Sequence, residues 1–187
     1  MIEQVVVVRH AEREDTVNKE WAASNALSYD TPLSAHGFEQ AEALASDLSG
    51  MCIAQKLGCK LRVAVVFGEW MNPDYFDLSV PPADNHTSIT ASSYNWVVRE
   101  ARSAVQYLDF AYDTRALGLP GSYGETWEEM HARAIRGIDT AIASEHNSVV
   151  IVVTHGSLCN SILGHLRRVP EMRRISQASW EAVKVTH

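Results

Sequence analysis

The sequence predicts a three-layer α/β/α fold, in which a mostly parallel central sheet lies between two layers of helices. Two runs of β-branched residues predict strands at residues 4–9 and 148–154. The runs are continuous rather than alternating, which is typical of parallel strands covered on both faces. Between them, apolar residues recur every three or four positions, as in amphipathic helices. With 187 residues, 46% of them hydrophobic, the chain can bury one sizeable core, and we expect a single domain over residues 1–187.

The first half of the chain is predicted to place helices and a short strand after the first strand. A loop rich in Pro, Ser and Gly precedes a helix expected from Phe38, with Leu44 and Leu48 on its apolar face. Helical spacing returns over residues 51–57. A β-branched run then predicts a short strand at residues 61–67.

The second half is predicted to be mainly helical between its strands. Residues 68–92 show little periodicity and are expected to form a long loop, which in compact domains is often functional. Helices are expected over residues 95–108 and 125–144, the second with an apolar stripe that we assign to the core. A further helix should follow His155, with its unpaired N–H groups facing the end of the preceding strand, where they attract anions. A final edge strand is expected within residues 175–185.

Composition and charge argue against several classes of function. The formal charge of −7 disfavours binding to a nucleic-acid backbone, which needs a dense basic face. The local exception is a group of arginines that we expect to be solvated, or else to steer an anion toward a nearby pocket: Arg167, Arg168, Arg173 and Arg174. The three cysteines lack CxxC spacing, so neither a disulfide framework nor a zinc knuckle is indicated. No run reaches the roughly 18 apolar residues of a membrane span, and residues 1–8 lack a signal peptide's features, so we expect a cytoplasmic protein without membrane partners.

Each predicted valine strand delivers a histidine to its carboxyl end. His10 follows Arg9, and His155 follows Thr154. Open α/β sheets bind ligands beyond these strand ends, so we expect both imidazoles in one site, with Arg9 and Arg13 facing it. Arginine suits phosphate because its planar fork stays charged and donates paired hydrogen bonds. Two cations beside His10 would keep it neutral, as a nucleophile must be, whereas His155 would donate to a phosphoryl oxygen.

Four short motifs follow one another along the chain. They are Arg9-His10-Ala11-Glu12, Asp30-Thr31-Pro32-Leu33-Ser34 with Gly37 and Gln40-Ala41, Gly124-Glu125-Thr126-Trp127-Glu128-Glu129, and Val153-Thr154-His155-Gly156-Ser157. In this order they resemble the histidine phosphatase superfamily, also called phosphoglycerate mutase-like. Further segments at Trp21 and at Phe67-Gly68-Glu69-Trp70 make the chain most similar to the ubiquitin-associated and SH3-containing phosphatases. The resemblance implies a phosphoglycerate mutase-like fold.

The resemblance also implies a metal-independent phosphatase that works in two steps without a cofactor. His10 would attack the phosphorus, a phosphohistidine would form, and water would release phosphate. Arg9, Arg13 and His155 would bind the equatorial oxygens and stabilise the charge of the transition state. Glu69 is the candidate general acid, which would protonate the leaving oxygen and later activate water.

Other titratable residues have weaker claims to a role. Glu125 is the rival acid, but at the expected start of a helix it fits better as an N-terminal acid near the positive end of the dipole. Glu12 adjoins the nucleophile, and a buried hydrogen-bonding role explains it as well as a catalytic one. His36 precedes a helix and is interpreted as structural. The remaining histidines lack metal-ligand spacing, so no metal site is assigned.

One departure from the family pattern affects both site and sheet. The family has a strand ending in Ser-Pro, then a second arginine and Thr-Ala, between the first helix and the region of Glu69. Here Ser49 leads almost directly into the helix predicted from Met51, as if that strand and its arginine were absent. The phosphate pocket would lose one cation, at a cost that Arg13 could partly offset. The sheet would keep an exposed edge and lower stability unless residues 61–67 pair in the gap.

Three functions therefore compete. The leading one is hydrolysis of a phosphomonoester, either a phosphorylated small molecule or a phosphoprotein, through a phosphohistidine. A phosphomutase would use the same intermediate but would need a bisphosphate primer. A catalytically impaired domain that binds phosphate or phosphoproteins is the alternative raised by the missing arginine. Residues 68–92 and 109–123 would shape the choice of substrate, and the sequence leaves a homodimer open.

Overall fold

The computed structural model describes residues 2–24, 31–49, 60–74, 107–146 and 149–185. The chain divides into two compact units. The first comprises Met1–His10, Ala64–Ala83 and Asp113–His187, and the second comprises Ala11–Val63 and Asp84–Tyr112. A single domain over residues 1–187 stays a prediction.

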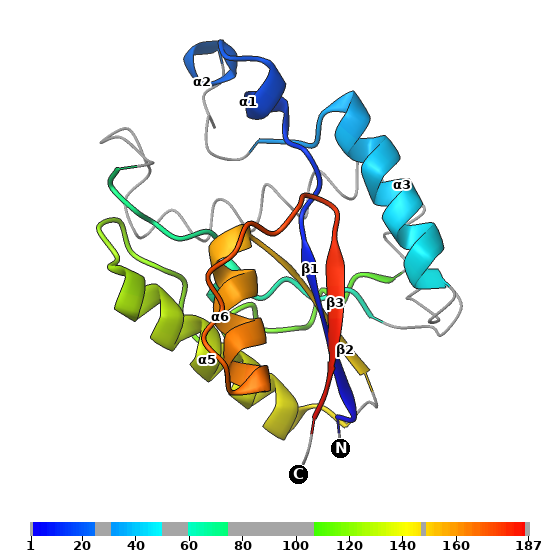
Figure 1. Cartoon of the computed structure of the whole chain (residues 1–187), viewed down its shortest axis with the longest axis vertical. Coiled ribbons are helices and arrows are strands. Elements are labelled where there is room, and N and C mark those ends of the chain that lie inside the picture. Colours follow the sequence, from blue (N-terminus) through cyan, green and yellow to red (C-terminus); the bar gives the residue numbers. More distant parts are fainter. Residues whose placement is uncertain (1, 25–30, 50–59, 75–106, 147–148, 186–187) are drawn as a thin grey trace. The chain divides into compact units, whose positions relative to one another are not determined.

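A three-stranded sheet lies in the first unit, counted over the described residues (Figure 1). Its strands are β1 (Gln4–Arg9), β2 (Val149–Thr154) and β3 (Trp180–Lys184), in the order β2-β1-β3. β1 pairs in parallel with β2 and antiparallel with β3, and the last residues of β1 and β2 are partners. The parallel pairing of the two valine runs and the mixed α/β class are confirmed. The final edge strand is also confirmed, within the predicted span.

The two valine strands are not covered equally. In β1, the side chains of residues 5–8 are all buried, as predicted for a strand covered on both faces. β2 alternates instead, with Val149 41% and Val153 62% exposed. Among the described residues β1 is its only strand partner, so β2 is an edge strand of the sheet that these residues form. The prediction that β2 is covered on both faces is wrong.

The strand predicted at residues 61–67 does not form. Leu61 makes only an isolated bridge, and Val65–Phe67 forms a 3-10 turn, η1. Val66 and Phe67 are consecutive and both buried, whereas a strand would point them to opposite faces. The turn lies beside β2, where the hydroxyl of Thr154 donates to the carbonyl of Phe67 at 2.7 Å. Among the described residues, β2 therefore keeps the open edge expected from the missing strand.

Two helices of the first unit, α5 (Trp127–Ser144) and α6 (Gly156–Arg167), lie side by side, and α6 packs on β1 and β3 (Figure 1). The apolar stripe of α5 belongs to the core as predicted, with Met130, Ala134 and Ile138 fully buried. α6 begins directly after the second valine strand, also as predicted. Its side chains join those of α5 and the sheet in one hydrophobic core.

α5 begins two residues later than predicted because Thr126 caps it. The Thr126 hydroxyl accepts a hydrogen bond from the Glu129 amide at 3.2 Å, and the Glu129 carboxylate accepts one from the Thr126 amide at 2.8 Å. This capping box satisfies two N–H groups that the first helical turn would otherwise leave without partners.

Replacing Thr126 with Ala is expected to lower the free energy of unfolding by about 1 kcal/mol, because the cap is lost. For a chain of this size that corresponds to a fall in Tm of about 2–4 °C, measurable by calorimetry. Thr140→Ala is the matched control, since Thr140 is exposed on the same helix and its hydroxyl bonds only the carbonyl of Arg136 among the contacts of the described residues. Equal Tm values for the two variants would contradict the role of the cap.

The second unit contains α1 (Glu14–Val17), α2 (Trp21–Ser24) and α3 (Ala35–Ser49). α3 begins three residues before the predicted Phe38, because the hydroxyl of Ser34 accepts a hydrogen bond from the Gly37 amide at 2.9 Å and so caps the helix.

Two other predicted helices cannot be compared in full. Residues 51–57 and 95–106 lie outside the described residues. At the end of the second predicted helix, Leu108 is not helical but forms the bridge to Leu61. No helix in the described ranges is both long and apolar enough to span a bilayer.

Candidate functional site

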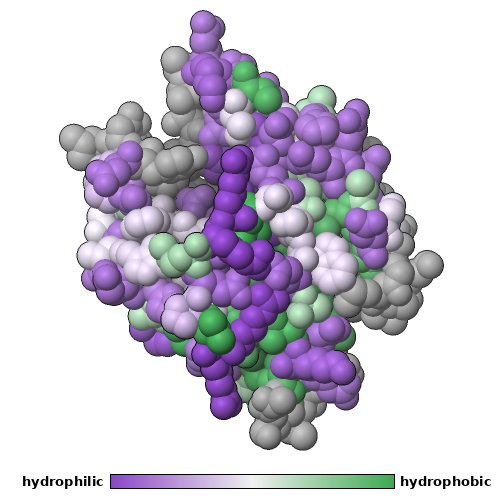
Figure 2. All heavy atoms as spheres, viewed as in Figure 1, coloured by the Kyte–Doolittle hydropathy of each residue, from purple (hydrophilic) through white to green (hydrophobic). Residues whose placement is uncertain are grey.

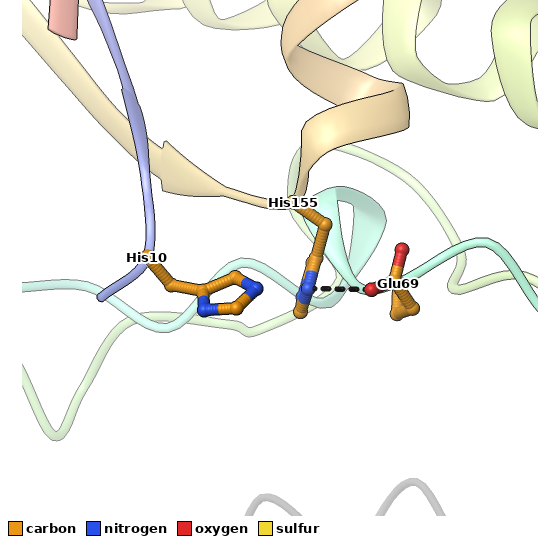
Figure 3. A group of neighbouring side chains, drawn as sticks. All are labelled: His10, Glu69 and His155. Carbon is orange, nitrogen blue, oxygen red and sulfur yellow. Dashed lines mark ion pairs between the residues drawn. The ribbon is translucent and has the colours of Figure 1, made fainter. Parts of the chain in front are cut away.

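His10 and His155 meet at the carboxyl edge of the sheet (Figure 3). Because β1 and β2 run parallel with Arg9 opposite Thr154, the residues that follow them emerge side by side. The amide of His10 donates to the carbonyl of Thr154 at 2.9 Å, which ties the two segments together just beyond the ladder. The ring centroids are 4.9 Å apart and the rings are inclined by 60°. The structure therefore brings together the two imidazoles that the sequence assigned to one site.

Glu69 approaches the same rings from the loop after η1 (Figure 3). Its Oε2 lies 2.9 Å from Nδ1 of His155, an ion pair when the imidazole is protonated, and the two side chains are 24% and 23% exposed. The geometry of this contact is not that of a hydrogen bond. Among the described residues, Nδ1 of His155 therefore has an ion-pair contact but no hydrogen-bond partner. The other oxygen, Oε1, accepts a hydrogen bond from the Trp70 amide at 3.0 Å. Two contacts thus orient the carboxyl group of Glu69 toward His155.

Arg9 extends across the start of α6. Its Nη1 donates to the carbonyl of Ile175 at 2.5 Å, and a side chain at Gly156 would come within 3.6 Å of its Nε. Nε is buried and has no hydrogen-bond partner among the described residues. His155 is the N-cap residue of α6, and no side chain caps that helix. A guanidinium and the N–H groups of a helix start both favour an anion at this point.

Arg13 belongs to the second unit, where it pairs with Asp15. The Nη2–Oδ2 and Nε–Oδ1 distances are 2.7 and 3.1 Å, so two of its donors are directed at this carboxylate. Its backbone forms an isolated bridge to Leu33. Because Arg13 and His10 belong to different units, the assignment of Arg13 to the phosphate site stays a prediction.

Glu12 and His36 have local contacts within the second unit. Glu12 accepts a hydrogen bond from the Ser34 hydroxyl at 2.7 Å, and its amide donates to the side chain of Gln40 at 2.9 Å. These bonds favour the structural alternative for Glu12. His36 is exposed, and its Nδ1 lies 3.3 Å from the carboxylate of Glu39 on the same helix.

Glu125 is not the helix N-terminal acid that the sequence predicted. It precedes α5, is only 7% exposed, and forms a bidentate pair with Arg133, which is 5% exposed. The Nε–Oε1 and Nη2–Oε2 distances are 2.6 and 2.8 Å. Both carboxylate oxygens of Glu125 therefore accept from the arginine, and Oε2 also accepts from the Met71 amide at 3.5 Å. Sequence reasoning missed Arg133, whose one signal is a charged residue beside Ala134 on the buried stripe of α5.

The four arginines around Pro170 are all exposed, as predicted, and two of them also form ion pairs. Arg167 and Arg173 pair with Glu171 and Glu181, with Arg167 Nη2–Glu181 Oε2 at 2.7 Å and Arg173 Nε–Glu171 Oε2 at 2.8 Å. The hydrogen bond from Arg173 lowers the pKa of the Glu171 carboxyl. Figure 2 shows a band of strongly hydrophilic surface over the region of α6. For Arg167 and Arg173, this local neutralisation argues against a role in steering anions.

Among the described residues, one group of side chains has donor atoms that could bind a metal ion, and it consists of His10, Glu69 and His155. Their ligand atoms all lie within 4.8 Å of one another. Ligands about 2.0–2.2 Å from one zinc ion lie at most about 4.4 Å apart. The upper limit on the separations of these ligand atoms is thus close to the largest separation that ligands of one zinc ion can have.

Cys159 lies in α6 and is buried. Burial raises the pKa of its thiol from the usual 9.0 to about 12, against the opposing effect of Arg9. At pH 8 only about one thiol in ten thousand is then ionised, and the thiolate is the reactive form. Because the folded pKa lies above the unfolded one, ionisation of this thiol lowers the free energy of unfolding as the pH rises above 9.0.

Iodoacetamide at pH 8 is therefore expected to leave Cys159 unmodified in the folded protein and to modify it in guanidinium chloride, as measured by peptide mass spectrometry. Modification of Cys159 at the same rate under both conditions would show that its burial does not protect it.

One protein-family model matches the chain by sequence over part of its length. Residues 96–187 match the family model described as histidine phosphatase superfamily (branch 1). The match includes His155 but not His10 or Glu69. No curated protein sequence is significantly similar to the chain.

Solved structures match over nearly the whole chain. A mycobacterial glucosyl-3-phosphoglycerate phosphatase in complex with VO3 has a TM-score of 0.59 at 21% identity, covering 96% of this chain and 92% of that one. Ecdysone phosphate phosphatase from Bombyx mori, in complex with tungstate, has a TM-score of 0.56 at 13% identity, covering 96% and 88%. The α-ribazole phosphatase from Shigella flexneri has a TM-score of 0.52 at 17% identity, covering 96% and 89%.

At these identities the structural matches show the fold alone. The fold is mixed α/β and phosphoglycerate mutase-like, as predicted. The family match over residues 96–187 is a likeness of that segment to the histidine phosphatase superfamily.

Proposed function

We propose that the chain hydrolyses phosphomonoesters through a phosphohistidine formed on His10. The observation that carries the proposal is the 4.9 Å approach of the His10 and His155 rings, with Glu69 Oε2 2.9 Å from His155. A nucleophile, a hydrogen-bond donor and an acid within reach of one another are what nucleophilic catalysis at phosphorus requires. Two of the phosphatases with the same fold hold VO3 and tungstate, which are oxyanions like phosphate.

In the first step, a ring nitrogen of His10 forms a bond to phosphorus while the ester P–O bond breaks, and Glu69 gives a proton to the leaving oxygen. Arg9, Arg13 and His155 donate hydrogen bonds to the phosphoryl oxygens, and the N–H groups at the start of α6 add to them. In the second step, water forms the new bond to phosphorus and the N–P bond breaks. Glu69 takes a proton from that water, so the enzyme returns to its starting state as phosphate leaves.

The proposed substrate is a phosphorylated small molecule. The phosphatases with the same fold are named for glucosyl-3-phosphoglycerate, α-ribazole phosphate and ecdysone phosphate. A phosphoprotein remains the alternative substrate. The finer placement near the ubiquitin-associated and SH3-containing phosphatases rests on sequence motifs alone, and no comparison supports it.

The test is to trap the intermediate. The protein is mixed with a radiolabelled phosphomonoester, quenched in alkali, and digested for peptide mapping. Phosphohistidine survives alkali and is lost in acid, so we expect an acid-labile label on the peptide that contains His10. Turnover of p-nitrophenyl phosphate without any such labelled peptide would contradict the proposed intermediate.

A phosphate-binding domain without turnover is the second candidate. It is favoured by the absent arginine motif and by the pairing of Arg13 with Asp15 at 2.7 Å. It predicts that vanadate binds, as measured by calorimetry, while no phosphoenzyme forms and no p-nitrophenyl phosphate is hydrolysed. Hydrolysis or transfer that requires a bisphosphate primer would instead indicate a phosphomutase.

A further inference from the structure

Arg133 holds the backbone of the loop that carries Glu69. Its Nη1 donates to the carbonyls of Val66 and Gly68 at 2.5 and 3.1 Å, and its Nη2 donates to the carbonyl of Glu69 itself at 3.4 Å. The guanidinium is 5% exposed, so these bonds are made away from bulk water, where leaving a carbonyl without a donor is costly. One buried side chain thus fixes three carbonyls of this short loop.

The other residues of the same loop are held from neighbouring elements. The carbonyl of Phe67 accepts a hydrogen bond from the hydroxyl of Thr154, immediately before His155, at 2.7 Å. The Trp70 indole donates to the carbonyl of Glu125 at 2.7 Å. Each residue from Val66 to Trp70 therefore has a hydrogen bond to β2, to Arg133 within α5, or to Glu125 just before that helix. The loop has little freedom to move Glu69 away from His155.

Glu125 orients the guanidinium. Its two carboxylate oxygens accept hydrogen bonds from Nε and Nη2 of Arg133. This bidentate pair leaves Nη1 facing the carbonyls of the loop. A guanidinium can serve a carboxylate and several carbonyls at once because its donors lie in one rigid plane, whereas an ammonium group is a point charge. The pair is also neutral overall, so it supplies fixed donors beside the loop without adding a net charge.

We propose that Arg133, oriented by Glu125, is the positioning residue that aims the carboxyl group of Glu69 at His155 and the leaving oxygen. The inference rests on the proposed function of Glu69 as general acid. Arg133 is not itself in contact with the reacting atoms. Its loss should therefore weaken proton transfer to the leaving group while sparing the attack by His10 on substrates that need no proton.

The test compares two substrates with different leaving groups. 2,4-Dinitrophenolate leaves without protonation, whereas phenolate depends on a general acid, and kcat/KM reports the step in which the leaving group departs. For Arg133→Lys we expect kcat/KM to fall about 10- to 100-fold with phenyl phosphate and to stay within about threefold of wild type with 2,4-dinitrophenyl phosphate. Glu69→Gln should show the same selective loss. Arg136→Lys is the matched control, since Arg136 is exposed on the same helix and should be unchanged with both.

Gly121→Ala is a second variant that disturbs the Glu125–Arg133 pair without changing either residue. It keeps the inference testable if Arg133→Lys does not fold. A side chain at Gly121 would lie 2.5 Å from Glu125 Oε2 and 2.9 Å from Arg133 Nη2, so it must displace the pair while leaving both charges present. We expect the same selective loss with phenyl phosphate. If the variants that fold lose activity equally on both substrates, or lose none, the inference is overturned.

A measurement that does not depend on catalytic activity tests this inference independently of the proposed function. In NMR spectra, the His155 imidazole resonances of Arg133→Lys should move toward those of Glu69→Gln, while those of Arg136→Lys should match wild type. Unchanged His155 resonances in Arg133→Lys would overturn the positioning role even in a chain that hydrolyses nothing. Full activity of His10→Ala on both substrates would overturn the proposed function instead.

Discussion

Replacing His10 with Ala is expected to reduce hydrolysis of p-nitrophenyl phosphate by at least about 10³-fold, which corresponds to about 4 kcal/mol of lost transition-state stabilisation. The reason is that the variant has no atom to form the covalent intermediate, and water must then attack the phosphomonoester directly. The rest of the candidate site, including Arg9 and the start of α6, is unchanged by this substitution. Binding of vanadate should therefore fall much less than the rate.

His165→Ala is the matched control for this variant. His165 lies on α6, and its Nε2 is 2.7 Å from Oδ1 of Asp139 on α5, away from the sheet edge that holds His10. Its loss should leave kcat and KM near their wild-type values. Equal rates for wild type and His10→Ala would rule out the phosphatase mechanism, because no step of that mechanism is possible without the nucleophile.

The parts of the fold that the sequence predicted correctly depend on local patterns. Four consecutive valines, residues 5–8, are buried in β1 because their type and spacing suit a strand covered on both faces. The stripe of α5 and the start of α6 after His155 follow from helical periodicity. The meeting of His10 and His155 could also be predicted, because parallel strands deliver their last residues to the same edge.

The parts that the sequence did not reveal depend on contacts between distant segments. Residues 61–67 have strand composition, yet Val66 and Phe67 are both drawn into the core and form a turn. Glu125 looked like a helix N-terminal acid because its partner, eight positions later, is visible only once α5 has formed. Nothing in the local pattern shows that Arg133 points inward to a loop that lies more than 60 residues earlier. Such tertiary contacts override local propensity.

Replacing Arg133 with Met is expected to lower the free energy of unfolding by about 3–5 kcal/mol, because it leaves the Glu125 carboxylate buried without its partner. Glu125 is 7% exposed, so solvent cannot take over the role of the guanidinium. The double variant Glu125→Met/Arg133→Met should lose less than Arg133→Met alone, because no unpaired charge is left in the core. Unfolding in guanidinium chloride of the wild type, both single variants and the double variant measures the coupling between the two residues.

The double variant also separates the stability of the ion pair from its effect on the loop. Although it should recover part of the stability that Arg133→Met loses, it supplies no donor for the carbonyls of Val66, Gly68 and Glu69. Its hydrolysis of phenyl phosphate should therefore remain as impaired as that of Arg133→Lys. A double variant that recovers stability and regains activity on phenyl phosphate would mean that Glu69 needs only a stable fold, and not the hydrogen bonds from Arg133 to the loop. A double variant whose loss equals the sum of the two single losses would mean that Glu125 and Arg133 stabilise the fold independently, despite their bidentate contact.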